Sequence, residues 1–378
     1  MSSGVKRRRR ADALLRLTWI VERSKYRASV LRLNRAINLE TCVNLRTLGY
    51  HITGVQRYLL SLLPHLPAEL GSVKPSRALQ GIKGHLWEQL YLPTQLKHRL
   101  LWSPGNTGPL GVTRQVLTVH DAAPLDHPEW FERKFALWYS ALLPRLIRKV
   151  RAIITVSHFS KDRIIRFTGV EPERIHVIFN GVDRRFRPMD PETAKEAVTS
   201  LGLTGPYILF VGSLEPRKNL KMLLKAWELG SFDGATLAVA GATGHLFERF
   251  ELNSIPKGVR LLGRVKDELL PALYSGATGF VYGSIYEGFG LPPLEALACG
   301  CPVAVSDIPP HREVCGGTAT YFDPFSPADL SSSLEDLLRL DRAQRASVAE
   351  QGVRHAALYS WETAAAETWQ ILKREANR

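Results

Sequence analysis

The sequence has no Asp-x-Asp motif, so it offers no obvious carboxylate pair to hold a divalent metal on a diphosphate. Cysteine is also scarce, and the spacing of Cys42, Cys299, Cys301 and Cys315 is not that of a zinc site. We therefore predict that the chain holds no metal and that its cysteines are free thiols in a reducing compartment.

Long apolar runs are missing as well, and no stretch approaches the roughly 20 residues that a membrane-spanning helix needs. Residues 14–21 are interrupted by Arg16 and followed by Glu22 and Arg23, which argues against a secretory signal. No G-x-G-x-x-G string follows a predicted strand, which disfavours a dinucleotide redox cofactor. These absences favour a cytoplasmic protein that works without a cofactor.

Acidic residues are the scarcer charge, because 36 Asp and Glu stand against 50 Lys and Arg, a net charge of +14. Such an excess suits an acidic ligand, nucleic acid or an anionic membrane surface. Much of it is local, since residues 6–10 are all basic and arginine recurs through Arg35. The total charge therefore identifies no partner, and we predict none among nucleic acids.

Residues 1–34 are predicted to be an extension that precedes the folded domains. Residues 11–33 place apolar side chains at roughly helical spacing among many basic ones, as in helices that lie on anionic membranes. A disordered or loosely docked basic tail explains the same composition. Both interpretations stay open, and the first would put the protein peripherally at the inner membrane face.

From residue 35 onward, short β-rich runs alternate with helical patterns in two successive sets. Continuous apolar strands between helices are typical of a parallel sheet that is covered on both faces. We therefore predict an α/β protein with two Rossmann-like domains, in which ligands bind at the carboxyl ends of the strands. The expected domains are residues 35–188 and 189–360, followed by a helix at 361–378 that packs back toward the first domain. The expected strands are residues 36–38, 116–120, 152–156, 175–179, 207–212, 236–240, 259–262, 279–282, 303–306 and 318–322, and the expected helices are 56–66, 132–150, 158–167, 220–228, 266–274, 293–298 and 327–338.

The most informative stretch begins at Glu287 and runs through a glycine turn into the start of a helix. The N–H groups of Gly288, Gly290 and Leu291, with the positive end of the helix dipole, meet the requirements for holding a phosphate. Glu287 and Glu295, one on each side of the turn, are better suited to accepting hydrogen bonds from hydroxyl groups. A diphosphate with a hydroxylated ring at each end fits this layout, which indicates a nucleotide-sugar.

The full string E-G-F-G-L-P-P-L-E-A-L-A-C-G-C-P-V, residues 287–303, resembles the E-x7-E signature of the retaining glycosyltransferases of family four. That family has the GT-B fold, so the resemblance implies two Rossmann-like domains whose parallel sheets face each other across a cleft. It also implies that Glu287 lies near the transferred sugar and that Glu295 holds the ribose of the donor. Phe289 would belong to the donor-binding turn.

A second constellation follows the expected strand at 207–212. Gly212 permits close backbone approach, and Arg217 and Lys218 are adjacent cations that could neutralise a diphosphate. The segment is similar to the family's G-x4-R-K-N string, which implies that both cations stabilise the departing nucleoside diphosphate. Ser213 stands where many members have arginine, which leaves open how many cations reach the phosphates.

The remaining candidates lie at the ends of strands or in the loops after them. Gly54 resembles the family's glycine loop, which faces the donor phosphate and the acceptor, and Ser157 resembles the first serine of its S-x-F-S-K run. His120 and Asp121 resemble its H-D-x-x-P segment, which implies contact with the transferred sugar or the acceptor. Glu313 matches a glutamate that is common in the family and is a suggested nucleotide contact.

The resemblance implies a retaining glycosyltransferase that moves a hexose from a nucleotide-sugar to a glycan or lipid-linked acceptor in cell-surface polysaccharide synthesis. Mannose is the expected hexose, on its prevalence in the family. Lys218, Arg217 and the helix start would meet the charge of the leaving group without a metal, and no side chain stands out as a nucleophile. Two alternatives remain: a nucleotide-sugar epimerase of GT-B shape, and a catalytically silent scaffold in glycan assembly.

Overall fold

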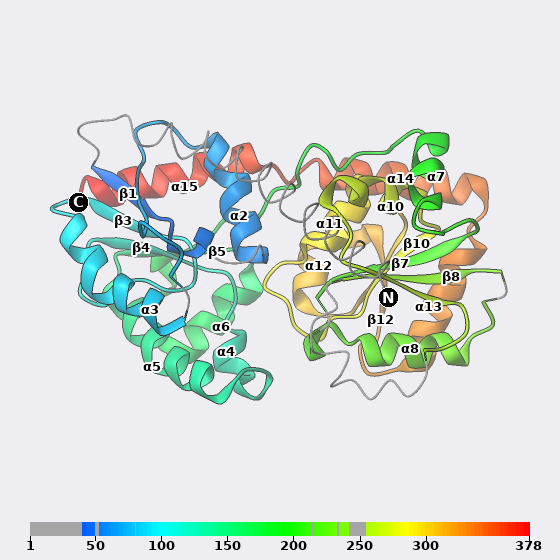
Figure 1. Cartoon of the computed structure of the whole chain (residues 1–378), viewed down its shortest axis with the longest axis horizontal. Coiled ribbons are helices and arrows are strands. Elements are labelled where there is room, and N and C mark those ends of the chain that lie inside the picture. Colours follow the sequence, from blue (N-terminus) through cyan, green and yellow to red (C-terminus); the bar gives the residue numbers. More distant parts are fainter. Residues whose placement is uncertain (1–39, 50–52, 80, 214, 233, 242–254) are drawn as a thin grey trace, which may run out of the picture. The chain divides into compact units, whose positions relative to one another are not determined.

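The computed structural model describes residues 40–49, 53–79, 81–213, 215–232, 234–241 and 255–378 (Figure 1). The basic extension at 1–34 and the expected strand at 36–38 lie outside the described residues. Within the described ranges, no helix combines the length and the apolar character needed to cross a membrane. The four cysteines are buried and form no disulfide with one another.

The first sheet has six strands in the order β2-β1-β3-β4-β5-β6. Every residue of β1, β3, β4 and β5 is buried, as expected for parallel strands that are covered on both faces. β4, β5 and β6 fall in the expected runs, whereas β1, β2 and β3 were not expected at their positions. The strands are β1 (Thr41–Asn44), β2 (Gly71–Val73), β3 (Leu100–Ser103), β4 (Gln115–Val119), β5 (Ala152–Thr155) and β6 (Ile175–Val177).

The second sheet also has six strands, in the order β12-β11-β10-β7-β8-β9, and each pair of neighbours in it is parallel. All six strands were predicted from their apolar runs. From β7 the chain first adds β8 and β9 on one side of the sheet and then β10, β11 and β12 on the other side. The strand order therefore reverses between β7 and β10, the two central strands, and ligands of such sheets bind at the carboxyl ends of the strands at this point. The strands are β7 (Tyr207–Val211), β8 (Thr236–Ala240), β9 (Val259–Gly263), β10 (Gly279–Tyr282), β11 (Val303–Ser306) and β12 (Ala319–Phe322).

Helices alternate with the strands, which confirms the α/β prediction (Figure 1). Each expected helix has a counterpart with shifted ends, but α3, α4, α7, α12 and α14 were not expected. The helices are α2 (Gly54–Leu62), α3 (Gly81–Leu86), α4 (Ala123–Asp126), α5 (Arg133–Lys149), α6 (His158–Thr168), α7 (Pro191–Thr199), α8 (Leu220–Leu229), α10 (Leu270–Gly276), α11 (Leu291–Ala298), α12 (Pro309–Cys315), α13 (Pro327–Arg339), α14 (Arg342–Ala356) and α15 (Trp361–Ala376).

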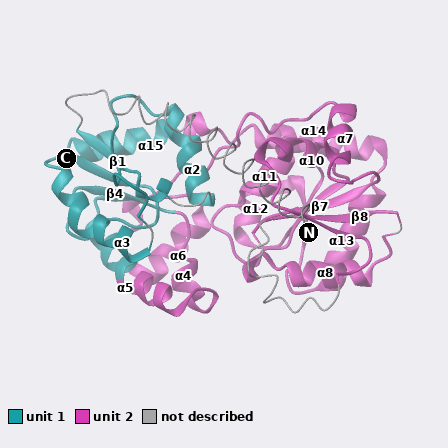
Figure 2. Ribbon diagram, in the orientation of Figure 1, with its two compact units in different colours: residues 1–119, 142–154, 365–378 teal, residues 120–141, 155–364 magenta. Residues whose placement is uncertain are grey.

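The chain divides into two compact units (Figure 2). One comprises the described residues up to 119 together with 142–154 and 365–378, and the other comprises 120–141 and 155–364. In the first unit the end of α15 is tied to the body by Arg151, whose Nη1 donates to the Glu375 carbonyl at 2.6 Å. The expected domain boundaries at 188 and 360 stay predictions.

Candidate active site

Gly288 lies in the turn between β10 and α11, where its backbone packs against the carbonyl oxygen of His120. A methyl group at Gly288 would stand 2.2 Å from that oxygen, so only glycine fits here. Ser157 Oγ donates a hydrogen bond of 2.6 Å to the Gly288 carbonyl. Three residues singled out from separate motifs, Gly288, His120 and Ser157, therefore lie together in the second unit.

The start of α11 retains its dipole but has few free donors. Gly290 is the N-cap residue, with a φ of +115° that favours glycine. Leu291 opens the helix and is followed by Pro292 and Pro293, which have no N–H. An anion at this end would be held by the dipole, the Leu291 amide and the amides of the turn.

Glu287, next to this turn, is buried and paired with two cations. Its Oε2 accepts from Arg217 Nη1 at 3.1 Å, and its Oε1 forms an ion pair with Lys218 Nζ. Lys218 Nζ also donates to the Tyr282 hydroxyl at 2.5 Å. Only 7% of Glu287 and 6% of Lys218 is exposed to solvent, so this is a charge cluster in the interior. We call these residues, Arg217, Lys218, Tyr282 and Glu287, the charge cluster.

The neighbouring charges decide how the groups of the charge cluster ionise. Burial alone would raise the pKa of Glu287, but Lys218 and Arg217 overcome it and hold that pKa far below its usual range. Burial also lowers the pKa of Lys218, and Glu287 only partly opposes this shift. The pKa of Tyr282 lies well above its usual value because of burial and the Glu287 charge. The cluster therefore keeps Glu287 ionised and Tyr282 protonated.

Arg217 is shared between two carboxylates. Its Nε donates to Glu215 Oε2 at 2.7 Å, while its Nη1 contacts Glu287. Ser213 Oγ donates to the other oxygen of Glu215 at 2.8 Å. Ser213, the position where the sequence departs from the family pattern, thus orients Glu215, which in turn orients Arg217. Among the described residues, no group of three or more His, Cys, Asp or Glu side chains is placed to hold a metal ion.

Glu295 is the fifth residue of α11 and is half-buried. Its Oε2 accepts a 3.1 Å hydrogen bond from the hydroxyl of Tyr274. Tyr274 is fully buried, and burial together with the Glu295 charge raises its pKa well above the usual value. Tyr274 therefore remains a donor that fixes the Glu295 carboxylate.

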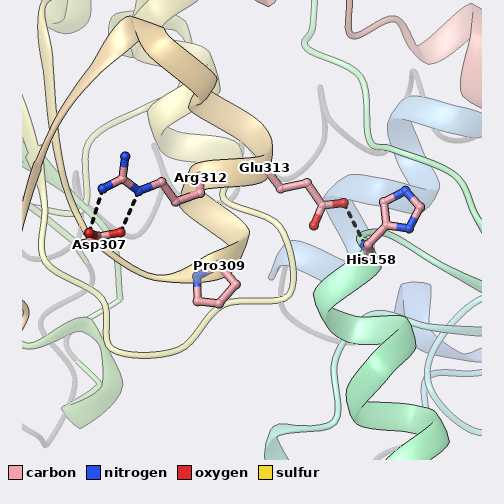
Figure 3. Close-up of a pocket in the computed structure, with 5 residues that line it drawn as sticks. All are labelled: His158, Asp307, Pro309, Arg312 and Glu313. Carbon is pink, nitrogen blue, oxygen red and sulfur yellow. Dashed lines mark hydrogen bonds and ion pairs between the residues drawn. The ribbon is translucent and has the colours of Figure 1, made fainter.

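A surface pocket at the carboxyl edge of the second sheet lies beside α6 and α12 (Figure 3). Glu313 Oε1 accepts the backbone N–H of His158 at 2.7 Å, so its carboxylate caps the first turn of α6. Arg312 makes a two-pronged ion pair with Asp307, both hydrogen bonds being 2.7 Å long. Glu313, the suggested nucleotide contact, is thus already engaged by backbone donors in this structure.

Two family models match this chain. The model described as glycosyl transferases group 1 matches residues 192–355, and the model described as glycosyltransferase family 4 matches residues 98–186. The O-antigen chain mannosyltransferase B of Escherichia coli is 30% identical over 297 residues, which cover 76% of this chain and 78% of that protein. The chain belongs to the family-four glycosyltransferases.

Other relatives agree with this assignment. The O-antigen chain mannosyltransferase RfbU of Salmonella typhimurium is 32% identical over 248 residues, which cover 65% of this chain and 66% of that protein. Among solved structures, HepE of Anabaena in complex with UDP and glucose matches 89% of this chain and all of that chain, with a TM-score of 0.72 at 18% identity. WaaG, a glycosyltransferase involved in lipopolysaccharide biosynthesis, matches 88% of this chain and 99% of that chain, with a TM-score of 0.68 at 15% identity. These likenesses confirm the predicted GT-B fold.

The other predicted site residues of this glycosyltransferase have more space around them or make only local contacts. Gly54 is the first residue of α2 in the other unit, and a methyl group there would meet nothing within 4 Å. Gly212 follows β7, and a methyl group there would lie 3.3 Å from the Phe210 ring. Asp121 Oδ1 accepts the Ala123 N–H at 3.0 Å and so shapes the turn before α4. Packing therefore does not demand glycine at Gly54.

Two residues at the site were not predicted. Tyr282 ends β10 and contacts Lys218, and its place at the end of an apolar strand is a signal that could have revealed it. His311 in α12 is fully buried, and its Nδ1 lies 2.9 Å from the Ser306 carbonyl oxygen. A carbonyl only accepts, so Nδ1 carries the proton and Nε2, which has no partner among the described residues, is an acceptor. Burial lowers the pKa of His311 to about 4, and no sequence pattern indicated this.

Proposed function

We propose that this glycosyltransferase moves mannose, with retention of configuration, from a nucleotide-sugar to a glycan or lipid-linked acceptor in cell-surface polysaccharide synthesis. The observation that carries the proposal is the charge cluster, in which buried Glu287 pairs with Lys218 and Arg217 next to the start of α11.

The two cations of the charge cluster suit a leaving group that gains negative charge. Both are held by ion pairs, and Lys218 is buried, so little reorganisation is needed when a nucleoside diphosphate departs. In the proposed reaction Lys218 and Arg217 neutralise the diphosphate while its bond to the sugar breaks. The dipole of α11 adds to this stabilisation. A metal ion is not required in this account.

The state of Glu287 favours retention without a covalent intermediate. Its carboxylate is held by two cations, which makes it a poor nucleophile, and its lowered pKa keeps it from donating a proton. A double displacement through a glycosyl-enzyme needs a free carboxylate at the sugar. We therefore assign Glu287 to orienting the transferred sugar, while the acceptor hydroxyl attacks on the face that the diphosphate leaves.

The remaining roles follow the family pattern. Glu295, held by Tyr274, is the proposed ligand of the donor ribose, and Gly288, Phe289, Gly290 and Leu291 form the proposed donor-binding turn. The residues proposed to face the sugar or the acceptor are His120, Asp121, Ser157 and Gly54. His120, Asp121 and Ser157 lie in the same unit as the charge cluster, and Gly54 lies in the other unit.

The choice of mannose rests on the relatives. The two relatives described above are named O-antigen mannosyltransferases, and each is matched over about two thirds or more of its length. We accordingly propose GDP-mannose as the donor and a growing surface polysaccharide or its lipid carrier as the acceptor. The buried free thiols fit a reducing compartment, so we place the reaction in the cytoplasm.

A panel of nucleotide-sugars tests the proposal. A donor at about a hundred times its dissociation constant stabilises the folded chain by roughly 2.7 kcal/mol, which a thermal shift detects. The stabilising donor is then incubated with acceptor, with and without excess EDTA, while nucleoside diphosphate and the sugar product are measured. Epimerised sugar without transfer would favour an epimerase, and binding without any turnover would favour a scaffold. Loss of transfer in EDTA with rescue by magnesium or manganese would contradict the account of the leaving group.

A further inference from the structure

The segment from α3 into the following turn is folded with its apolar side outward. α3 continues as a π-helical turn at Trp87–Tyr91. Ile82, Leu86 and Leu90, four residues apart, are 78%, 53% and 70% exposed, and Tyr91 is 54% exposed. Because residues four apart lie on one face of a helix, these side chains form a single stripe. We call them the α3 stripe.

The opposite face of this segment is buried although it carries a charge. Gly84, Glu88 and Leu92 are buried, and each follows a residue of the stripe by two positions. Glu88 Oε1 accepts from Asn44 Nδ2 at 2.7 Å and from Arg46 Nε at 3.1 Å. These contacts at the end of β1 fix the rotation of the segment. The chain therefore buries a glutamate here while it leaves leucine and isoleucine in solvent, which the folded core does not require.

The exposed charge along residues 71–99, the segment that carries the stripe, has one sign. Between residues 71 and 99 the only acidic residue is Glu88, and it is fully buried in its ion pair with Arg46. Lys83 lies next to the stripe in α3 and is exposed. The exposed surface of this segment thus combines aliphatic side chains with positive charge and offers no exposed carboxylate. The Lys and Arg residues of the segment are Lys74, Arg77, Lys83, Lys97 and Arg99.

We propose that the α3 stripe inserts into an anionic lipid surface, with Lys83 on the headgroups. Leucine and isoleucine on one face, a tyrosine at its end and basic residues beside it are the composition of helices that lie in a membrane interface. Negative headgroups complement the single-sign charge, at a gain that grows with each basic residue near the surface. The inference goes beyond the proposed reaction and does not depend on which sugar is transferred. It is also separate from the basic extension, which lies outside the described residues.

Point variants of the full chain test this surface. The double variant Leu86→Glu with Leu90→Glu puts two charges into the stripe, and Leu229→Glu with Leu358→Glu is the matched control, because these leucines are 66% and 75% exposed elsewhere. Each protein is sedimented with vesicles of phosphatidylcholine alone and of phosphatidylcholine with phosphatidylglycerol. We expect the stripe variant to lose at least about tenfold in partitioning onto the anionic vesicles, while the control binds like the parent chain.

Several outcomes would overturn the proposal. Equal vesicle binding by the stripe variant and the control would remove the stripe from the membrane, as would a parent chain that does not bind anionic vesicles. If the stripe variant keeps its vesicle binding but changes from a dimer to a monomer in size-exclusion chromatography, the stripe is an interface between copies. Nucleoside diphosphate release on a soluble acceptor is measured in parallel. A chain that docks but transfers no sugar would retain this inference and reject the proposed function.

Discussion

At the scale of single residues, Glu287 balances the buried Lys218 and the partly buried Arg217, so its loss affects stability and chemistry in different ways. Removing one partner of a buried pair leaves an uncompensated charge, at a cost of about 3–5 kcal/mol. We expect Glu287→Gln to lower the free energy of unfolding by that order and to reduce turnover strongly. Free nucleoside diphosphate should bind as well as before or more tightly, because Lys218 and Arg217 are no longer neutralised. Calorimetric titration and chemical denaturation measure the two effects.

Glu295 should behave differently from Glu287. If its carboxylate accepts hydrogen bonds from the ribose, Glu295→Ala weakens both the nucleotide-sugar and the free nucleoside diphosphate by about 1.5–3 kcal/mol. Tyr274→Phe is the matched control, because it removes the hydroxyl that holds Glu295 and keeps the carboxylate. Unchanged diphosphate affinity in Glu295→Ala would exclude the ribose role. Equal losses of diphosphate binding in the Glu287 and Glu295 variants would show that the two roles are not divided as proposed.

His311 makes a prediction about acid stability. Its pKa is about 4 in the folded chain, against 6.5 for an ordinary histidine, so the unfolded chain binds this proton first as the pH falls. The folded state should therefore lose up to about 3 kcal/mol between pH 6.5 and pH 4 from this group. Glu287 affects stability at a lower pH than His311 does. Its contribution to the free energy of unfolding is fully present above the ordinary glutamate pKa of 4.5 and is lost only as the pH falls below that value. We expect His311→Asn, which keeps a donor toward Ser306, to flatten the upper part of this loss. A parallel pH profile in variant and parent would refute the assignment.

At the scale of elements, packing requires glycine at position 288 but not at position 54, so the two glycines can be tested for different roles. Gly288 has no room for a methyl group, because the obstacle is the backbone carbonyl of His120, whereas Gly54 has open space. We expect Gly288→Ala to destabilise the chain and abolish transfer. Gly54→Ala, in the first turn of α2, should leave the melting temperature unchanged or higher and still lower transfer, if a ligand approaches that backbone. Full activity in Gly54→Ala would remove this residue from the donor and acceptor loop.

Sequence patterns predicted the elements that have long apolar runs and overlooked those that do not. All strands of the second sheet are four or five residues of mostly apolar sequence between turn residues, and each was expected. β2 has three residues, which are too few for a periodic signal. β3 is an exception, because its four residues are mostly apolar, like those of β10 and β11, and it was overlooked all the same. α14 was overlooked for another reason: only Gly352 and Ala356 are buried along it, so it has no continuous apolar face.

The candidate site shows the same division between local and long-range information. Glu287, Lys218 and Arg217 were each singled out from their own segments, because strand ends and glycine turns are local features. That Glu287 pairs with both cations could not be predicted, since 69 residues separate it from Lys218 and only the packed sheet brings them together. The partner of Glu313 was missed for the same reason, because the N–H groups that it accepts lie 155 residues away at the start of α6.

At the scale of the whole molecule, the hypothesis that the basic extension docks on a membrane rests mainly on its charge. Each Lys or Arg near an anionic leaflet contributes about 1 kcal/mol, and residues 6–10 are all basic. Such attraction is screened over roughly 10 Å at 0.1 M salt, whereas apolar insertion is not weakened by salt. The extension and the α3 stripe should therefore respond differently to salt.

The last prediction concerns a chain that lacks residues 1–34. We expect it to bind vesicles of phosphatidylcholine with phosphatidylglycerol more weakly than the full chain at low salt, and the difference should shrink as salt is added. Transfer to a soluble acceptor analogue should change little, because every proposed site residue lies from Gly54 onward. Sedimentation with vesicles across a salt series, with the transfer assay alongside, measures both. If the shortened chain binds as well as the full chain at low salt, the extension is a tail without a membrane role, and lipid docking must come from the folded units.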